Sequence, residues 1–259
     1  IGPARPAEAL TLAGGWGWFT HVEVLSREAA ARVVRASDCD PAELAPFTTA
    51  RAPIAGLSFD RPRVMGILNA TPDSFSDGGL HAEARAAVAA GTAMRAAGAD
   101  MLDIGGESTR PGAETVPAED EIARVVPVIE GLRAAGAGAI SIDTRKAATA
   151  EAAVDAGADL VNDVAALTFD PELAPFCAAK GLPVCVMHAQ GDPATMQQDP
   201  QYGNVLLDVY DFLERQIDRL EATGVIREQI VIDPGIGFGK TQEHNLTLLR
   251  NLSLFHGLG

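Results

Sequence analysis

The sequence is poor in cysteine and in aromatic residues. Its three cysteines, Cys39, Cys177 and Cys185, form no CxxC or other metal-binding spacing, and aromatic residues make up only 5% of the chain. No HExxH motif or Cys/His cluster is present, which excludes the usual sequence signatures of a structural zinc site. We therefore expect a protein with reduced, unreactive thiols, with Cys185 buried in the strand "PVCVMH".

Positive charge is also scarce. Lys and Arg number 20 against 35 Asp and Glu, which gives a formal net charge of −15. Such a balance disfavours a general nucleic-acid surface or an anionic membrane surface. No apolar run approaches the roughly 20 residues that a membrane helix requires. We expect a cytoplasmic protein without nucleic-acid or membrane partners.

The stretch "DPGIGFGKT", from Asp233 to Thr241, lacks one essential feature of a nucleotide-binding phosphate loop. That loop needs a glycine five positions before the glycine of G-K-[ST]. The residue there is Pro234, which has no N–H to offer a phosphate, and the acidic Asp233 precedes it. The pattern excludes an ATP site, and we expect Lys240 to enter the following helix without touching a nucleotide.

A repeated unit of strand, polar loop and amphipathic helix is present from Arg63 onward. The expected strands are 63–68, 99–105, 139–143, 158–163, 182–188 and 229–233. The expected helices are 82–98, 118–136, 145–157, 171–181, 204–224 and 243–257. The strands are apolar at nearly every position, which predicts a parallel sheet covered on both faces.

Strict alternation of strands and helices is compatible with a doubly wound sheet or with a TIM (β/α)₈ barrel. The polar residues favour the barrel, because nearly every strand ends in one and a barrel gathers these ends into a single site. These residues are Asn69, Asp103, Asp143, Asn162, His188 and Asp233. Only six βα units are visible, so we expect the last two to lie outside this chain.

The predicted barrel domain spans 61–259, and 1–60 form an N-terminal extension. Within the extension, "EAAARVVRA" suggests a short helix and "DCDPAELAPFTTARAP" is rich in turn residues. The extension either caps the bottom of the barrel or forms a small appendage. The sequence leaves both possibilities open.

Three loop motifs follow predicted strands: "NATPDSFSDGG" at 69–79, "GGESTRPG" at 105–112, and "DPGIGFGK" at 233–240. Together with "SIDTRK", "LVND" and "VMHAQG", they occur in the order found in one family. On these motifs, 63–259 resembles dihydropteroate synthase, the folate-pathway transferase targeted by sulfonamides. That family condenses 6-hydroxymethyl-7,8-dihydropterin diphosphate with 4-aminobenzoate, yielding 7,8-dihydropteroate and diphosphate.

The resemblance implies roles for individual residues. The catalytic residues would be Asp143, Asp233 and Asn69, with Asn69 also holding a Mg²⁺ ion that contacts the diphosphate. The substrate-binding residues would be Thr109, Asp143, Asn162, Asp233, Met187, Phe238, Gly237, Phe75 and Arg110. Carboxylates suit the amino-pyrimidinone edge of a pterin, because they accept two parallel N–H bonds. Phe75 and Phe238 would flank the aminobenzoate, and Asp77 could pair with Arg110 on loop closure.

The resemblance also implies a homodimer, a Lys that covers the pterin, and an Arg–His pair that binds diphosphate. We expect the Lys, Arg and His beyond Gly259. Several residues have simpler readings: Asp143 and Asn162 as helix caps, Asp103 as support for the loop at 105–112, His188 as a satisfied core or loop residue, and Phe238 as packing. Two other functions stay open. One is a related pterin-barrel methyltransferase, and the other is a non-catalytic paralogue that binds pterin or a partner protein.

Overall fold

The protein is described by a computed structural model. The structure describes residues 4–70, 80–108, 115–190, 196–197 and 199–259.

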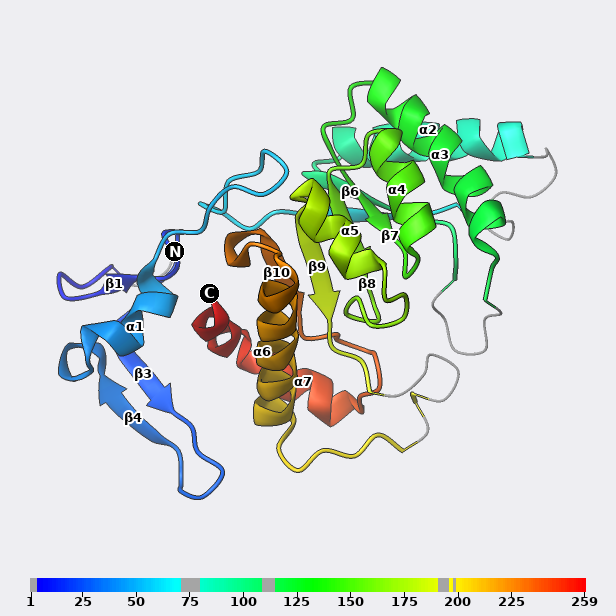
Figure 1. Cartoon of the computed structure of the whole chain (residues 1–259). Coiled ribbons are helices and arrows are strands. Elements are labelled where there is room, and N and C mark those ends of the chain that lie inside the picture. Colours follow the sequence, from blue (N-terminus) through cyan, green and yellow to red (C-terminus); the bar gives the residue numbers. More distant parts are fainter. Residues whose placement is uncertain (1–3, 71–79, 109–114, 191–195, 198) are drawn as a thin grey trace.

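Six parallel strands form the central sheet, in the order in which they occur along the chain (Figure 1). They are β5 (Met65–Asn69), β6 (Met101–Gly105), β7 (Ala139–Asp143), β8 (Leu160–Asp163), β9 (Val184–Met187) and β10 (Ile230–Asp233). A doubly wound sheet reverses its strand order at a switch point, whereas this order runs in one direction. The predicted α/β architecture is confirmed, and the strand order is that of consecutive units of a TIM barrel.

Each strand is followed by a helix that packs on the outer face of the sheet. The helices are α2 (Leu80–Ala96), α3 (Ala118–Ala134), α4 (Ala147–Asp155), α5 (Leu173–Lys180), α6 (Val205–Thr223) and α7 (Gln242–Arg250), with 3₁₀ turns η3 (Arg227–Gln229) and η4 (Leu252–Leu258). The side chain of Asn204 caps the first turn of α6, and Gly224 ends that helix with φ +104°. In the described part of the chain, none of the helices is both long enough and apolar enough to cross a bilayer.

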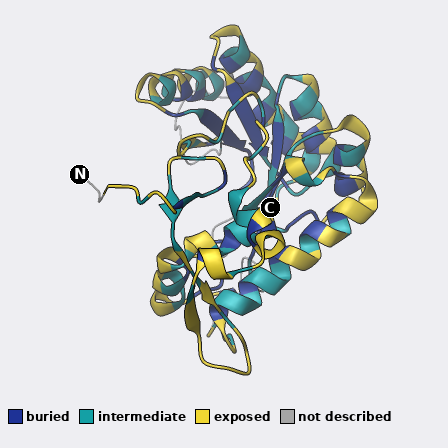
Figure 2. Ribbon diagram, turned by 90° about the vertical axis from the view of Figure 1, so that its left-hand side faces the viewer, coloured by how far each residue is buried: buried dark blue, intermediate teal, exposed yellow. Residues whose placement is uncertain are grey.

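The main hydrophobic core lies between the sheet and these helices, and Figure 2 shows it as the continuous buried layer. Its strand residues include Leu102, Ile140 and Val161, which are 0% exposed. Cys177 and Cys185 are buried free thiols. Burial raises the pKa of Cys177 to about 12 and that of Cys185 well above its usual value. The prediction that Cys185 is a buried strand residue is confirmed.

The prediction that both faces of every strand are covered is wrong for β5. Met65 and Ile67 are 36% and 56% exposed on the inner face of this strand, whereas all five residues of β6 are buried. The difference arises because β5 is an edge strand, paired only with β6 in the described structure. An edge strand has neighbouring side chains on one flank only.

The N-terminal extension both caps the bottom of the barrel and forms a small appendage, the two possibilities that its sequence left open. Its elements are β1 (Leu10–Thr11), β2 (Trp18–Phe19), β3 (His21–Val24), β4 (Arg32–Arg35), η1 (Ala36–Asp38) and α1 (Pro41–Thr48). The antiparallel pair β3–β4 is largely exposed. Ile54, Leu57 and Phe59, by contrast, pack against the amino-terminal ends of the barrel strands and close the inner face from below.

Two local predictions in this extension are wrong. "EAAARVVRA" contains strand β4, because Val33 and Val34 pair with β3 across an antiparallel ladder, and β-branched residues favour that environment. "DCDPAELAPFTTARAP" contains α1, which begins at Pro41 after a cap from the Asp40 side chain. A capping residue followed by proline is a readable helix-start signal.

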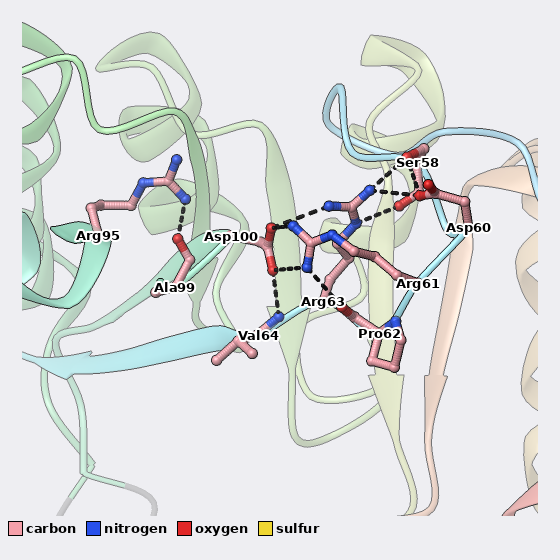
Figure 3. A network of polar contacts seen from close by, with 9 residues as sticks. All are labelled: Ser58, Asp60, Arg61, Pro62, Arg63, Val64, Arg95, Ala99 and Asp100. Atoms are coloured by element: carbon pink, nitrogen blue, oxygen red, sulfur yellow. Dashed lines mark hydrogen bonds and ion pairs between the residues drawn. The ribbon is translucent and has the colours of Figure 1, made fainter. Parts of the chain in front are cut away.

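The junction between the extension and the barrel is held by a polar network around Asp100 (Figure 3). Asp100 Oδ2 accepts a hydrogen bond of 2.9 Å from the backbone N–H of Val64, and its Oδ1 pairs with Arg61 and Arg63. The Val64 N–H and then the Arg61 guanidinium lower the pKa of Asp100 to about 2. This carboxylate ties the residue before β5 to the residue before β6, and so holds the register of the first strand pair.

Candidate active site

One face of the sheet carries a row of polar residues near the carboxyl ends of the strands. Side chains alternate between the two faces of a strand, and the packing of the lower cap identifies the inner face. The residues that meet the cap there are Met101, Ala139, Leu160, Cys185 and Val231. Residues an even number of positions further on share that face: Asp103, Asp143, Asn162, Met187 and Asp233.

The strand register places these residues beside one another. Asn69 pairs with Gly105, Gly105 with Asp143, and Asp143 with Asn162, while Met187 pairs with Asp233. A Cβ atom at Gly105 would lie 3.4 Å from Asp143 Oδ2 and 3.6 Å from Asn69 Oδ1. The two oxygens therefore flank the space that the glycine leaves open.

Negative charge accumulates at this end of the sheet. Burial raises the pKa of Asp143 well above its usual value, and the charges of Asp103, Asp163, Glu121 and Glu107 raise it further. Within the described residues, Asp143 Oδ1 is a buried acceptor without a hydrogen-bond partner. Buried acceptors are normally paired, so this arrangement suits a ligand that supplies N–H donors.

Asp103 supports a neighbouring site residue. Its Oδ2 accepts a hydrogen bond of 3.0 Å from the side-chain amide of Asn162, and the side chain is 2% exposed. We expected Asp103 to support the loop at 105–112, but its bond goes to Asn162. The bond leaves the amide oxygen of Asn162 as the group available to a donor on a ligand.

The loop after β10 uses its own N–H groups internally. Gly235 N–H donates to Asp233 Oδ1 at 2.7 Å, Gly237 N–H to Asn245 Oδ1 at 2.8 Å, and Phe238 N–H to the Gly235 carbonyl at 3.1 Å. A phosphate loop would direct such groups at an anion. The exclusion of an ATP site agrees with this geometry.

The prediction that Lys240 enters the following helix is wrong. Helix α7 begins at Gln242, and Lys240 is 4% exposed with its ammonium group turned back into the loop. The cap of α7 is Thr241, whose hydroxyl accepts from His244 N–H. His188, 5% exposed, contacts this lysine, which confirms its reading as a satisfied core or loop residue.

A buried ion-pair network lies behind the loop at 105–112. Glu107 pairs with Arg145 and with Lys146, and Lys146 pairs at 2.6 Å with Glu121, which is 0% exposed. The network joins the start of that loop, which follows β6, to α3 and to the loop that follows Asp143 at the end of β7.

Replacing Lys146 with Met should therefore destabilise the protein strongly. Removing one partner of a buried ion pair leaves an uncompensated charge, which costs about 3–5 kcal/mol. Glu221→Gln is the matched control, because the Glu221–Arg227 pair is exposed and such pairs contribute about 0–1 kcal/mol. Chemical denaturation of both variants measures the difference, and a loss below about 1 kcal/mol for Lys146→Met would contradict the expectation.

Asp163 faces the outer side of β8 and holds the turn that follows. Its two carboxylate oxygens accept from the N–H groups of Ala165 and Leu167, each at 2.7 Å. Leu167 has φ +56°, a conformation that needs such support. Burial raises the pKa of Asp163 to about 6 in spite of these hydrogen bonds.

This shift predicts a pH dependence of stability. A carboxyl group whose folded pKa is raised binds more protons in the folded state, so its contribution is lost as pH rises from about 4 to about 6. The shift from 3.8 to about 6 corresponds to on the order of 3 kcal/mol. The unfolding free energy of the wild type, measured relative to Asp163→Asn, should fall by that order across this range. A flat difference between the two curves would count against the assignment.

The site offers a divalent cation a partial set of oxygen ligands. No group of three or more His, Cys, Asp or Glu side chains able to hold a metal occurs in the described residues. Asn69 Oδ1 and Asp143 Oδ2 flank the open space at Gly105, and Mg²⁺ prefers such oxygens while taking further ligands from substrate phosphates and water. The donors present fit an ion that the substrate helps to hold.

Comparison with known proteins identifies the family. Residues 65–259 match the sequence pattern of the family described as "Pterin binding enzyme". The dihydropteroate synthase of Synechocystis sp. is 46% identical over 210 residues, which cover 80% of this chain and 73% of that protein. The chain belongs to the dihydropteroate synthase family.

Solved dihydropteroate synthases have a similar structure. The enzyme of Xanthomonas albilineans with 4-aminobenzoic acid superposes with a TM-score of 0.72 at 48% identity, covering 79% of this chain and 73% of that one. A complex of the same bacterial enzyme with 7,8-dihydropteroate gives a TM-score of 0.67 at 45% identity, covering 76% and 69%. These similarities support the barrel assignment.

Most of the predicted site residues lie together in the structure. Asn69, Asp143, Asn162, Met187 and Asp233 line one face of the sheet, and Gly237 and Phe238 lie in the loop after β10. The residues predicted to bind substrate that lie outside the described part of the structure are Thr109, Arg110 and Phe75, together with Asp77.

The helix-cap readings of Asp143 and Asn162 are wrong. Helix α4 begins after Lys146, three residues beyond Asp143, and the Asn162 amide bonds to Asp103. The dihydropteroate synthase motifs alone did not indicate the roles of Asp103 and Lys240. For Asp103, the available signal was its position two residues before Gly105 on the same strand face.

Proposed function

We propose that this protein is a dihydropteroate synthase that joins 6-hydroxymethyl-7,8-dihydropterin diphosphate to 4-aminobenzoate. The single observation that carries the proposal is the row of Asp143, Asn162 and Asp233 on one inner face, in which the buried Asp143 Oδ1 has no hydrogen-bond partner among the described residues. The family membership supports the same reaction.

The pterin ring is bound by its donor-rich edge. Asp233 and Asp143 accept N–H bonds from the amino-pyrimidinone, and charge-assisted pairs of this kind are strong. Asn162, held through Asp103, supplies an amide oxygen for a ring N–H. Met187 offers a polarizable surface to the ring.

The same carboxylates assist the reaction. The bond between the pterin methylene carbon and the diphosphate oxygen breaks, and the electron pair leaves with diphosphate. The arylamine nitrogen forms a new bond to that carbon and then loses a proton. Nearby negative charge stabilises the cationic character that develops on the pterin, and this help increases toward the transition state.

Asn69 would hold Mg²⁺ near the diphosphate, and the bound ion would supply positive charge to offset that of the leaving group. Asn69→Ala should raise the Mg²⁺ concentration needed for half-maximal activity by about tenfold or more, since loss of one ligand weakens a sparse site. Asn69→Asp, which keeps an oxygen donor, is the matched control and should shift it less. An unchanged Mg²⁺ requirement in Asn69→Ala would remove this residue from the metal site.

The 4-aminobenzoate binds over the loop after β10, against Gly237 and Phe238. Thr109, Arg110 and Phe75, which lie outside the described residues, would also contact the substrates, and Arg110 would pair with Asp77. Normal turnover of 4-aminobenzoate by Arg110→Ala would refute that pairing.

One experiment separates the candidate functions. The purified protein is mixed with pterin diphosphate and Mg²⁺, and diphosphate release is followed on addition of 4-aminobenzoate. Release together with dihydropteroate formation is expected of the synthase. Pterin binding without release would identify the non-catalytic paralogue. Relatives named dihydropteroate synthase, and the motifs at 69–79 and 105–112, favour the synthase over a methyltransferase.

A homodimer is also part of the proposal. Leu246 and Leu249 on α7 and Leu252 in η4 are 42%, 48% and 45% exposed. They follow one another at intervals of three residues, and exposed apolar residues that gather on one face favour an association surface. Sedimentation measurements giving a monomer at micromolar concentration would overturn it.

A further inference from the structure

Lys240 is buried beneath the loop after β10 and is surrounded by acceptors. Its ammonium nitrogen donates to the carbonyls of Gly235 at 2.8 Å, Phe238 at 2.9 Å and His188 at 3.2 Å, and it lies 2.9 Å from Nδ1 of His188. An ammonium group has three donors and no acceptor. A single side chain therefore satisfies backbone carbonyls on both sides of Gly237.

His188 provides a fixed anchor for this lysine. Its ring packs edge-on to Phe212 at a centroid distance of 4.8 Å, and its backbone N–H donates to the Asp233 carbonyl at 2.9 Å. Burial, and then the charge of Lys240, lower the pKa of His188 to about 4. The ring is neutral at physiological pH, so Nδ1 can accept from the ammonium.

The loop follows a path that depends on inward-facing carbonyls. Gly235, Gly237 and Gly239 all have positive φ, at +68°, +89° and +61°. The backbone at Gly235 approaches the His188 carbonyl so closely that a Cβ atom would lie 1.9 Å from that oxygen. Without the Lys240 ammonium group, the Gly235 carbonyl would keep only the Phe238 N–H as a donor, and the nearby His188 carbonyl would lose the side-chain donor that Lys240 supplies. Buried carbonyls normally have such a partner.

From this geometry we propose that Lys240 is a positioning residue for the arylamine substrate. It holds the turn at 235–238 against the end of β9. It thereby fixes the position of Gly237 and Phe238 relative to the residues proposed to bind the pterin, Asp143, Asn162 and Asp233. The inference rests on the proposed function. It assigns Lys240 no contact with either substrate, because the side chain is 4% exposed.

The part of the pterin site formed by Asp143 and Asn162 should be insensitive to Lys240. Asp143 and Asn162 lie on β7 and β8 and are held by strand pairing and by Asp103. Loss of Lys240 should therefore impair 4-aminobenzoate far more than the pterin. A merely structural role would lower stability without separating the two substrates.

The test compares Lys240→Met with Thr241→Ala. In Lys240→Met the KM for 4-aminobenzoate should rise by about tenfold or more with a fall in kcat, because small misplacements near a reacting group can cost on the order of 10²-fold. The Kd for pterin diphosphate should change by less than about threefold. Thr241→Ala removes only the cap of α7 and should lower Tm while leaving both substrate constants unchanged.

The outcomes are distinct. Equal weakening of both substrates, or unchanged constants, in Lys240→Met would overturn the inference. If that variant does not fold, Lys240→Arg, which keeps the charge and donors but changes their reach, must show the same selective rise for 4-aminobenzoate, and its absence there overturns the inference equally. Absence of 4-aminobenzoate-dependent diphosphate release in the wild type would instead refute the proposed function.

Discussion

Asp143→Asn should lose most catalytic activity and yet unfold less readily than the wild type. The carboxylate is placed to accept N–H donors from a pterin and to stabilise positive charge, and removal of one such electrostatic contact typically lowers kcat by about 10²–10³. The folded protein without substrate has no compensating charge for it, because burial and the neighbouring acids raise the pKa of Asp143 well above its usual value. Relief of that repulsion should add about 0.5–2 kcal/mol to the unfolding free energy.

The stabilising effect should depend on pH in a defined direction. A carboxyl group with a raised folded pKa gives its full contribution below the unfolded pKa and loses it as pH rises. The stability gap between Asp143→Asn and wild type should therefore widen with increasing pH. Denaturation curves at several pH values, with kcat/KM at each, measure both effects.

Asp159→Asn is a suitable control for this experiment. Asp159 immediately precedes β8, at the opposite end from Asn162, and pairs with Arg133. Its replacement should lower stability and leave kcat/KM within about threefold of wild type, since surface-facing contacts act only on the fold. Near-normal activity of Asp143→Asn would show that this carboxylate does not assist the reaction. A lower stability of that variant would show that the carboxylate does not destabilise the folded protein.

Gly235→Ala should destabilise the protein far more than Gly136→Ala. The two glycines have nearly the same backbone angle, φ +68° and +71°, but a Cβ atom meets the His188 carbonyl at 1.9 Å in the first case and nothing within 4 Å in the second. Placing alanine in the left-handed region costs roughly 1–2 kcal/mol at either position. At Gly235 the backbone at His188, just after β9, must also move, which adds about 1–3 kcal/mol or more.

The comparison isolates steric contact from backbone preference. Urea denaturation of the two variants should differ by about 2 kcal/mol or more, a large share of a typical total stability of about 5–15 kcal/mol. Equal losses at the two positions would mean that the loop after β10 is not pressed against β9 as the structure describes. The position of Asp233 next to this contact makes the result relevant to the site.

Much of the site was predictable because its signals are local. Apolar runs of four to seven residues, each ending in a polar residue and followed by a helix, predicted parallel strands with Asn69, Asp143, Asn162 and Asp233 at their ends. The period of two along each strand then places these residues on one face once the register is known. Loop motifs at 69–79, 105–112 and 233–240 predicted the family, and no long-range contact had to be inferred for that.

The errors share a different cause. Lys240 was expected to enter the helix that follows the loop, but its side chain turns back to His188, which lies 52 residues away in the sequence. Asp103 was assigned to the nearest loop, whereas its partner Asn162 is 59 residues away. A buried polar group binds whatever the packing of separate strands brings to it, and a single sequence does not specify that neighbour.

By itself, then, the sequence determined the order of strands and helices, the family, and the acids and amide at the strand ends, because periodicity and turn chemistry are properties of adjacent residues. Only the tertiary structure decided that Ile54, Leu57 and Phe59 close the barrel from below and that Asp103 orients Asn162. It alone also showed that Lys240 holds the β10 loop to β9. These are contacts between segments far apart in the chain, and their geometry exists only after the sheet has assembled and excluded water from its interior.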